Sequence, residues 1–246
     1  MLIVNADDWG LRAEVTDAIL ACWRAGAISA ASGMTFMADS RRAATLAAES
    51  RLPLGLHLNL TTPFTGGEVA TEAGVRQRKA CEYFAGPRRR RFLFDPKVRP
   101  LLDHCVADQV DGFADQYGAL PAHADGHEHI QVSPTVLSTR ALGRLASVRA
   151  AHSFPPGRSS LPKRLHRFAL NRVVEWRFGE VRFLSLRDLH PDLGGSGLER
   201  ELDAAGSGHV ELMVHPAWDD ERRVLLSAGW REILSGVELG SRADLR

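Results

Sequence analysis

The chain has 246 residues, of which 44% are hydrophobic and 25% charged, and its net charge is +1. This composition is ordinary for a globular enzyme, and the near-neutral charge gives no indication of binding to nucleic acid or to an anionic membrane. No apolar run reaches the roughly 20 residues of a transmembrane span, no signal peptide is recognisable, and three widely spaced cysteines indicate a reducing, cytoplasmic setting.

The first sixty residues alternate between strand and helix patterns. Short apolar runs with strand character are separated by stretches in which apolar residues recur at helical spacing, and Gly26 is placed to end the first helix. This β-α-β-α-β rhythm predicts parallel strands joined by helical crossovers. The predicted elements are strands over 2–6, 27–38 and 52–60 and helices over 12–25 and 39–50.

Residues 61–95 interrupt this rhythm. The segment contains glycines, prolines and the basic runs "RQRK" and "PRRRRF", without a clear period. A stretch of this length inside one domain predicts a functional lid or a mobile insertion at the rim of the site.

The alternation then resumes to the end of the chain, and about seven strands result in total. Residues 1–246 are therefore interpreted as a single domain, an α/β barrel or near-barrel of parallel strands, with an open doubly wound sheet as the structural competitor. The remaining predicted elements are helices over 96–118, 134–147, 161–177, 198–205 and 219–235 and strands over 122–125, near 148, over 181–184 and over 209–215.

Polar residues stand where four of these strands end. Asp7 and Asp8 follow the first strand, His57 lies in the third, "HADGHEH" (123–129) contains the fourth, and His215 ends the last. Active sites of α/β barrels gather at such carboxyl ends. His57 alone is as well explained by a core histidine, whereas three histidines and two acids within seven residues make a poor core and a good metal site, with a polar surface loop as the alternative.

Two adjacent carboxylates repel each other unless something compensates their charge. A divalent cation held by one aspartate and by imidazole nitrogens would do so, and the other aspartate would stay free as a base. Neighbouring residues on a strand point to opposite sides, so a turn near Trp9 and Gly10 must bring both to one side. With His215 as proton donor, the reaction class is metal-assisted hydrolysis.

Four blocks, "LIVNADDWGL", "GLHLNLT", "HADGHEHIQVSP" and "ELMVHP", together resemble the YdjC/ChbG family of carbohydrate deacetylases, in the family's order over residues 2–216. The resemblance implies a polysaccharide-deacetylase-like (β/α) barrel that removes N-acetyl groups from amino sugars with one divalent metal ion, Mg²⁺ or Zn²⁺. By motif, Asp7 resembles the base and His215 the general acid, while Asp8, His57 and His127 resemble the metal ligands. The resemblance also suggests a homodimer.

Two residues depart from the family pattern. Gln131 stands where a further histidine is common, which affects a contact outside the first metal ligands or to the sugar. Trp9 stands where Phe is usual and would reshape the floor of the site.

Several further residues are candidates for contact with the substrate, and each has a structural alternative. Arg149 is equally an ordinary strand-end arginine, Asn59 and Thr61 are better explained as turn formers, and Glu211 faces either the interior or an exposed edge. Trp218 would stack on a sugar or pack in the core. The candidates for substrate binding are Trp9, Asn59, Asp125, His129, Arg149 and Glu211.

The four arginines 88–91 form either a solvated face or a site for an anionic group such as a phosphate. Two other functions compete with deacetylation. Another metal-dependent barrel hydrolase, acting on a cyclic amide or phosphoester, would share the metal site, although such barrels usually open with His-x-His. A non-catalytic sugar-binding relative would be expected to have lost the base or the ligands, all of which are present. No nucleophile elbow, P-loop or dinucleotide fingerprint is found.

Overall fold

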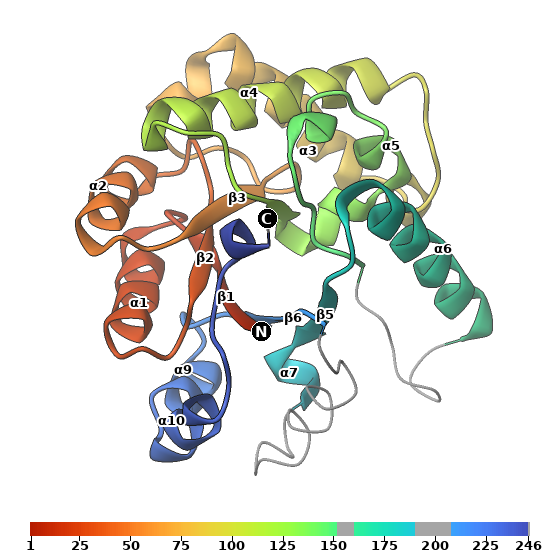
Figure 1. Ribbon diagram of the computed structural model, residues 1–246. Helices are drawn as coiled ribbons and strands as arrows, with labels where there is room; N and C mark the ends of the chain where they lie inside the picture. The colour runs from red at the N-terminus through yellow and green to blue at the C-terminus, as the bar shows by residue number, and fades with distance from the viewer. Residues whose placement is uncertain (152–159, 190–207, 246) are drawn as a thin grey trace.

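The computed structural model describes residues 1–151, 160–189 and 208–245. Six parallel strands form one curled sheet in the order β4-β3-β2-β1-β6-β5, which is an α/β half-barrel (Figure 1). The seventh predicted strand, near Val148, contributes only an isolated bridge to Ala124. The strands are β1 (Leu2–Trp9), β2 (Ala30–Gly33), β3 (Leu54–Leu58), β4 (Ala124–Gly126), β5 (Arg182–Ser185) and β6 (Val210–Val214).

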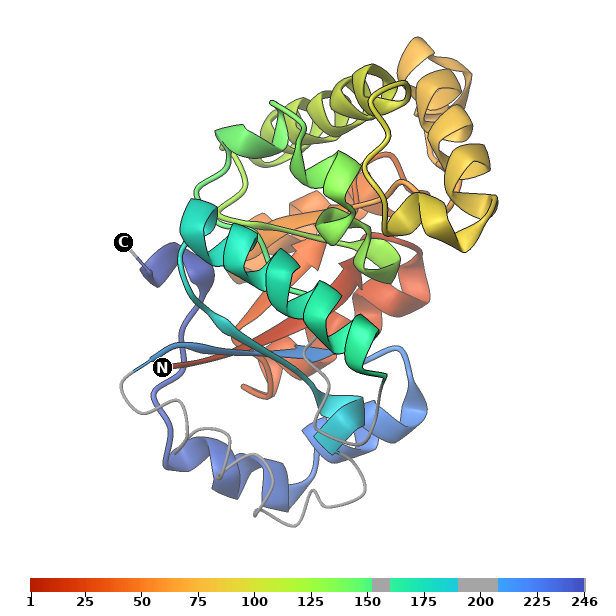
Figure 2. The same cartoon turned by 90° about the vertical axis from the view of Figure 1, so that its right-hand side faces the viewer.

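Helices pack around the outside of this sheet, as Figures 1 and 2 show from two sides. Among the described residues, none of them combines the length and apolar character that crossing a bilayer requires. The α-helices are α1 (Ala13–Arg24), α2 (Ser40–Ser50), α3 (Glu72–Ala85), α4 (Arg99–Tyr117), α5 (Pro134–Leu137), α6 (Leu161–Phe178), α7 (Leu186–Leu189), α9 (Asp219–Leu225) and α10 (Ala228–Ser235). The short 3₁₀ helices are η1 (Gly67–Ala70), η2 (Arg88–Arg91), η3 (His127–Val132), η4 (Leu142–Arg144) and η5 (Arg242–Asp244).

β1 lies in the middle of the sheet because its apolar run can be buried on both faces. Leu2, Ile3 and Val4 have no exposed surface. The strand pairs with β2 on one side and with β6 on the other, so that Ala6 lies opposite Val214. The carboxyl end of β1, with its two aspartates, therefore lies beside the end of β6, which is followed directly by His215.

The two larger apolar cores lie on the helix-covered side of the sheet. One joins β1 and β6 to α1, α2, α9 and α10, and the other joins β3 and β4 to α3, α4 and α6. The inner side of the half-barrel holds polar and charged side chains instead, each at most 3% exposed. These side chains are Asn5, Asp7, Ser32, His57, His123, Asp125, Arg149 and Glu211. The interior of the half-barrel is therefore polar and is suited to hold a functional site.

Three further stretches of local structure differ from the predictions. The segment 61–95, for which the sequence shows no clear period and predicts no helix, contains α3, a helix whose N-cap Thr71 accepts a hydrogen bond from the amide of Gly74 at 3.2 Å. The helix expected over 134–147 ends at Leu137. The hydroxyls of Ser138 and Thr139 donate to carbonyls three residues earlier, both at 2.7 Å, and such bonds compete with helix continuation.

The last predicted helix, 219–235, is two helices, because Ser227 caps the second one by accepting from the amide of Trp230 at 3.1 Å. The helix predicted over 198–205 lies outside the described residues. The other predicted helices are found close to their expected bounds.

Candidate active site

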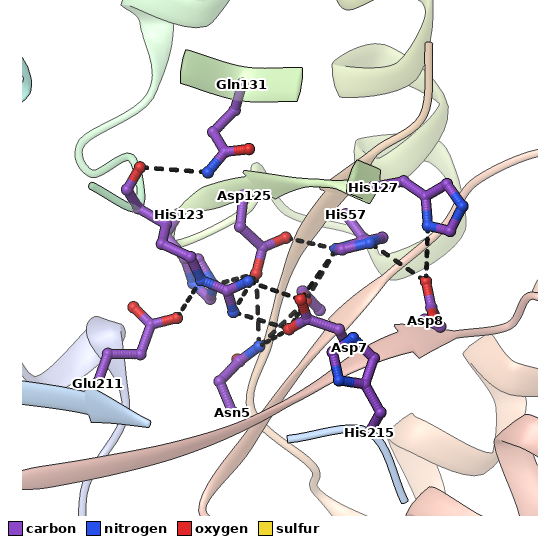
Figure 3. Close-up of polar contacts among 12 residues, drawn as sticks. Asn5, Asp7, Asp8, His57, His123, Asp125, His127, Gln131, Glu211 and His215 are labelled. Atoms are coloured by element: carbon purple, nitrogen blue, oxygen red, sulfur yellow. Dashed lines mark hydrogen bonds and ion pairs between the residues drawn. The ribbon is translucent and has the colours of Figure 1, made fainter. Parts of the chain in front are cut away.

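The turn that the two adjacent aspartates require is made by Asp8 itself. Its φ of 74° is in the left-handed region, which aspartate tolerates better than most residues. Gly10 follows with a φ of 86°, and a Cβ there would come within 3.2 Å of the Cα of Ser40. The left-handed residue interrupts the regular pairing of β1 with β2, whose register shifts between Ala6 and Trp9, so Asp7 and Asp8 both reach the site (Figure 3).

Asp8 contacts two histidines from different strand ends. Its Oδ1 is 3.2 Å from Nε2 of His57 and 3.2 Å from Nδ1 of His127. Burial alone would raise the pKa of Asp8, but the two imidazoles more than offset this, and its pKa lies well below the usual range. The three side chains have donor atoms within 4.8 Å of one another, a spacing that suits a metal ion.

The orientation of His57 is fixed by Asp125. Nδ1 of His57 is 2.7 Å from Oδ1 of Asp125, so that Nε2 faces Asp8. A carboxylate behind an imidazole in this way fixes the tautomer of a metal-ligating histidine. Burial would lower the pKa of His57, but the carboxylates of Asp125 and Asp7 raise it to about 10.

Asp7 belongs to a second network, centred on Arg149. Nη1 and Nη2 of Arg149 donate to the two oxygens of Asp7 at 2.6 and 2.7 Å. The same guanidinium is 2.6 Å from Oδ2 of Asp125 and donates from Nε to Oε1 of Glu211 at 2.6 Å. Arg149 has no exposed surface, and it is held by three carboxylates from three strands.

Two neighbours of Asp7 were not predicted from the sequence. Asn5 donates from Nδ2 to Oδ1 of Asp7 at 2.9 Å, and the hydroxyl of Ser32 donates to the same oxygen at 3.2 Å. Asn5 precedes Asp7 by two residues on one strand, so both point to the same side. A polar residue inside the run "LIVNA" was the available signal. Ser32, in a short run of small residues, gave none.

His215 lies one residue beyond the last β1–β6 pair, beside Asp7 in Figure 3. Its ring stacks on Trp218 with a centroid distance of 4.1 Å, and the guanidinium of Arg187 covers the same indole at 4.4 Å. Its amide donates to Oε2 of Glu221 at 2.6 Å, and the same oxygen is 3.9 Å from Nδ1. Burial lowers the pKa of His215 and raises that of Glu221 to about 7.

Other predicted residues lie away from the Asp8 cluster. Trp9 is buried in the outer core, and buried Asn59 forms a turn by accepting from the amide of Thr62 at 3.0 Å. The ring of His129 packs 5.8 Å from that of Phe183. Gln131 donates to the carbonyl of Arg149 at 3.4 Å, away from Asp8 (Figure 3).

The segment after β3 returns to the same end of the barrel through η2. Arg91 contacts Glu128 at 2.5 Å, and Glu128 follows His127 directly. A cavity of about 810 Å³ lies beside this pair and is lined by Arg88, Arg91, Lys163 and Arg167 among others. Arg90 does not line this cavity. It donates to the carbonyl of Tyr83 at 2.9 Å and covers the ring of Tyr83.

Among the described residues, two further groups have the spacing of metal ligands: Asp7, His57 and Asp125, and His123, Asp125 and Glu211. Each includes carboxylates that already contact the guanidinium of Arg149. A cation there would be repelled by Arg149, so these groups are poor metal sites. The Asp8 group contains no such contact with a guanidinium and fits the chemistry of a divalent ion best.

A parallel half-barrel with acidic and imidazole side chains at its carboxyl end defines a protein of the α/β-barrel enzyme class. A sequence model described as "YdjC-like protein" matches residues 1–236. The chain therefore belongs to the YdjC-like protein family.

Curated relatives cover most of the chain. A carbohydrate deacetylase from Danio rerio is 26% identical, over 89% of this chain and 82% of the relative. A chitooligosaccharide deacetylase from Yersinia pestis (strain Pestoides F) is 27% identical, over 94% of this chain and 86% of the relative. A crystal structure from Enterococcus faecalis, of a protein proposed to cleave cellobiose phosphate, matches with a TM-score of 0.64 at 20% identity, over 99% and 98%. At this identity the last match shows the fold alone.

Proposed function

We propose that this protein is a metal-dependent hydrolase that removes an N-acetyl or related N-acyl group from an amino sugar. The observation that carries the proposal is the division of two adjacent carboxylates between two networks: Asp8 faces two imidazoles, while Asp7 is held by Arg149. The names of the two curated relatives support carbohydrate deacetylation as the reaction.

Asp8, His57 and His127 would hold the metal ion. The buried cluster around them contains four carboxylates, those of Asp7, Asp8, Asp125 and Glu211, and two guanidiniums, those of Arg149 and Arg242. With the histidines neutral, a divalent ion would balance these described charges. When bound, such an ion supplies Lewis acidity toward the acyl carbonyl and acidifies water.

Asp7 would serve as the general base. Its Oδ1 accepts hydrogen bonds from Asn5, Ser32 and Arg149, whereas Oδ2 has one hydrogen-bond donor among the described residues, Nη1 of Arg149. Oδ2 therefore keeps a lone pair with which to take a proton. The donors on Oδ1 restrict rotation of the carboxylate, so the base is held in one orientation.

His215 would serve as the general acid toward the departing amine. His215 follows β6, which pairs with β1. The acid and the base would therefore approach the substrate from the ends of two neighbouring strands. The stack on Trp218 fixes the plane of the ring, and Trp218, at 39% exposed, also offers a flat face for a sugar.

The residues expected to touch the substrate divide into two sets in this proposal. Asn59, Asp125, Arg149 and Glu211 are fully buried, so we assign them to positioning rather than to direct contact. The rim would come from His129 and from the segment 61–95, whose Arg91 lies at the site through Glu128. This segment is proposed as the lid.

One experiment tests the function directly. Release of acetate from a panel of N-acetylated mono- and oligosaccharides is measured with metal-loaded protein, metal-stripped protein and the Asp7→Asn variant. Turnover by the loaded wild type alone supports the proposal. No release from any sugar, combined with hydrolysis of a cyclic amide or phosphoester, would favour the other metal-dependent hydrolase.

A further inference from the structure

The C-terminal segment closes the half-barrel at the end opposite the site. Leu2 donates its amide to the carbonyl of Glu238 at 2.8 Å, and the amide of Gly240 donates to the carbonyl of Leu2 at 3.1 Å. The segment thus runs beside the start of β1, and η5 lies across the centre of the sheet (Figure 1). The next residues, Ser241 and Arg242, are 5% and 4% exposed.

Arg242 extends from this segment to Glu211 inside the barrel. Its Nε donates to Oε2 of Glu211 at 2.6 Å, while Oε1 of the same carboxylate accepts from Nε of Arg149 at 2.6 Å. Glu211 has no exposed surface. One buried carboxylate therefore joins a guanidinium from the chain terminus to the guanidinium that holds Asp7 (Figure 3 shows the Glu211 side).

A second contact leads to the same place. Nη1 of Arg242 donates to the hydroxyl of Ser147 at 2.5 Å. The backbone carbonyl of Ser147 accepts from Ala124 at 3.0 Å, and the amide of Arg149 donates to the carbonyl of Ala124 at 2.9 Å. Arg242 thus holds both the carboxylate in front of Arg149 and the backbone two residues before it.

The charges explain why this connection matters. Arg149 is shared by Asp7, Asp125 and Glu211, each with an atom 2.6 Å from it. Without Arg242, Glu211 would keep Arg149 as its only guanidinium partner among the described residues. A buried carboxylate that has lost one of its positively charged partners destabilises the folded protein. Glu211 would therefore draw Arg149 toward itself and away from Asp7.

We infer that Arg242 is a positioning residue for the general base, acting from the opposite end of the barrel through Glu211 and Arg149. This inference rests on the proposed function, in which Asp7 is the base. Arg242 touches neither Asp7 nor the Asp8 cluster in the described structure, so it acts on them only through Glu211 and Arg149. Arg149 binds Asp7 with both terminal nitrogens, but it contacts Asp125, which orients His57, with one. The structure therefore predicts a loss in kcat that is larger than any loss of metal binding.

The test compares Arg242→Ala with Arg144→Ala. Arg144 and Arg242 both line a cavity of about 790 Å³ at this end of the barrel, but Arg144 pairs with exposed Asp111 at 2.9 Å rather than with Glu211. On a verified substrate we expect kcat of Arg242→Ala to fall by about 10- to 100-fold, the usual cost of losing an orienting partner around a metal site. KM and metal content stay near wild type, and guanidinium at low millimolar concentration restores part of kcat. Arg144→Ala retains wild-type kcat.

A double-mutant cycle separates this role from a merely structural one. In a Glu211→Gln background, Arg242→Ala should cost much less than it does alone, because both act on Arg149 by one route. Independent, multiplying losses would overturn the inference, as would wild-type kcat in Arg242→Ala or a loss that guanidinium does not relieve.

If Arg242→Ala does not fold, Arg242→Lys is tested instead, because it keeps the charge but cannot contact both Glu211 and Ser147. Wild-type kcat in that variant overturns the inference. If Asp7→Asn retains turnover in the same assay, the proposed function fails. If Asp7→Asn is inactive and the Arg242 variants are unaffected, the inference alone fails.

Discussion

Asp7 and Asp8 are neighbours in the chain, yet different residues hold them. Among the described residues only His57 has contacts with both, at 3.9 Å from Asp7 and 3.2 Å from Asp8. Asp7 is held by both terminal nitrogens of Arg149, and Asp8 by one nitrogen each of His57 and His127. The left-handed turn at Asp8 makes this separation possible. Two like charges are thus compensated independently, and the two carboxylates can have different roles.

Substituting the two aspartates separately should therefore give different defects. Asp7→Asn should abolish turnover while the metal stays bound, because Asp7 is outside the Asp8 cluster. Asp8→Asn should weaken metal binding itself, because it removes the single carboxylate of that cluster. Metal content after dialysis, measured beside acetate release, distinguishes the two. Equal metal loss in both variants would contradict the division.

Metal binding should depend on pH through His57. Asp125 and Asp7 raise the pKa of His57 to about 10 against the effect of burial, so below that pH an incoming ion must displace a proton. Affinity should rise with pH, and a proton should be released on binding. Calorimetric titration in two buffers of different ionisation enthalpy measures this release. His57→Ala should bind the ion far more weakly, and unchanged affinity would refute the ligand assignment.

His215→Ala should lose about 10²- to 10⁴-fold in kcat, the usual contribution of a general acid, with little change in metal affinity. Since Asp7 must be ionised and His215 protonated together, kcat/KM should have a bell-shaped pH dependence. Burial lowers the pKa of His215, so the alkaline decline should begin below the pH at which an ordinary histidine titrates. Near-wild-type turnover in the variant would remove His215 from the mechanism.

Glu221 should make the protein less stable as pH rises from 5 to 8. Burial raises its pKa to about 7 in the folded state, above the ordinary 4.5, so the folded protein binds more protons than the unfolded chain between these values. Stability therefore decreases with pH in this window, by an amount on the order of a few kcal/mol. Thermal unfolding of Glu221→Gln should show a weaker decrease, whereas exposed Glu232→Gln should follow the wild type. Parallel curves for wild type and Glu221→Gln would show that Glu221 is not the cause.

The arginine-lined cavity predicts a preference for anionic substrates. Arg88 and Arg91 line it, whereas Arg90 packs on Tyr83. Arg88→Ser with Arg91→Ser should raise KM for phosphorylated acetylamino sugars by about tenfold, since charge-assisted hydrogen bonds to a phosphate are lost, and should leave neutral sugars unchanged. Arg89→Ser is the matched control. An equal change in KM for neutral and anionic sugars would count against a phosphate site.

The sequence alone was sufficient for the features that depend on local pattern. Apolar runs predicted the parallel strands, and polar residues at their ends predicted which side chains would meet, because the carboxyl ends of parallel strands share one edge of the sheet. Asp8, His57 and His127 do meet there. Local pattern was less reliable where side-chain hydroxyls ended a helix, as at Ser138, because the competing hydrogen bonds are short-range details that hydrophobic periodicity does not record.

What only the tertiary structure decided is how the charges are paired. Arg149 contacts Asp7 from 142 residues away and Arg242 contacts Glu211 from 31 residues away. The sequence made Arg149 a candidate for substrate contact and gave no signal for Arg242, and it predicted neither pairing. Periodicity shows which side of a strand a residue occupies, but it does not show which other buried charge lies opposite. That pairing depends on strand order and on the curl of the sheet, which place β1, β4, β6 and the C-terminal segment around one guanidinium.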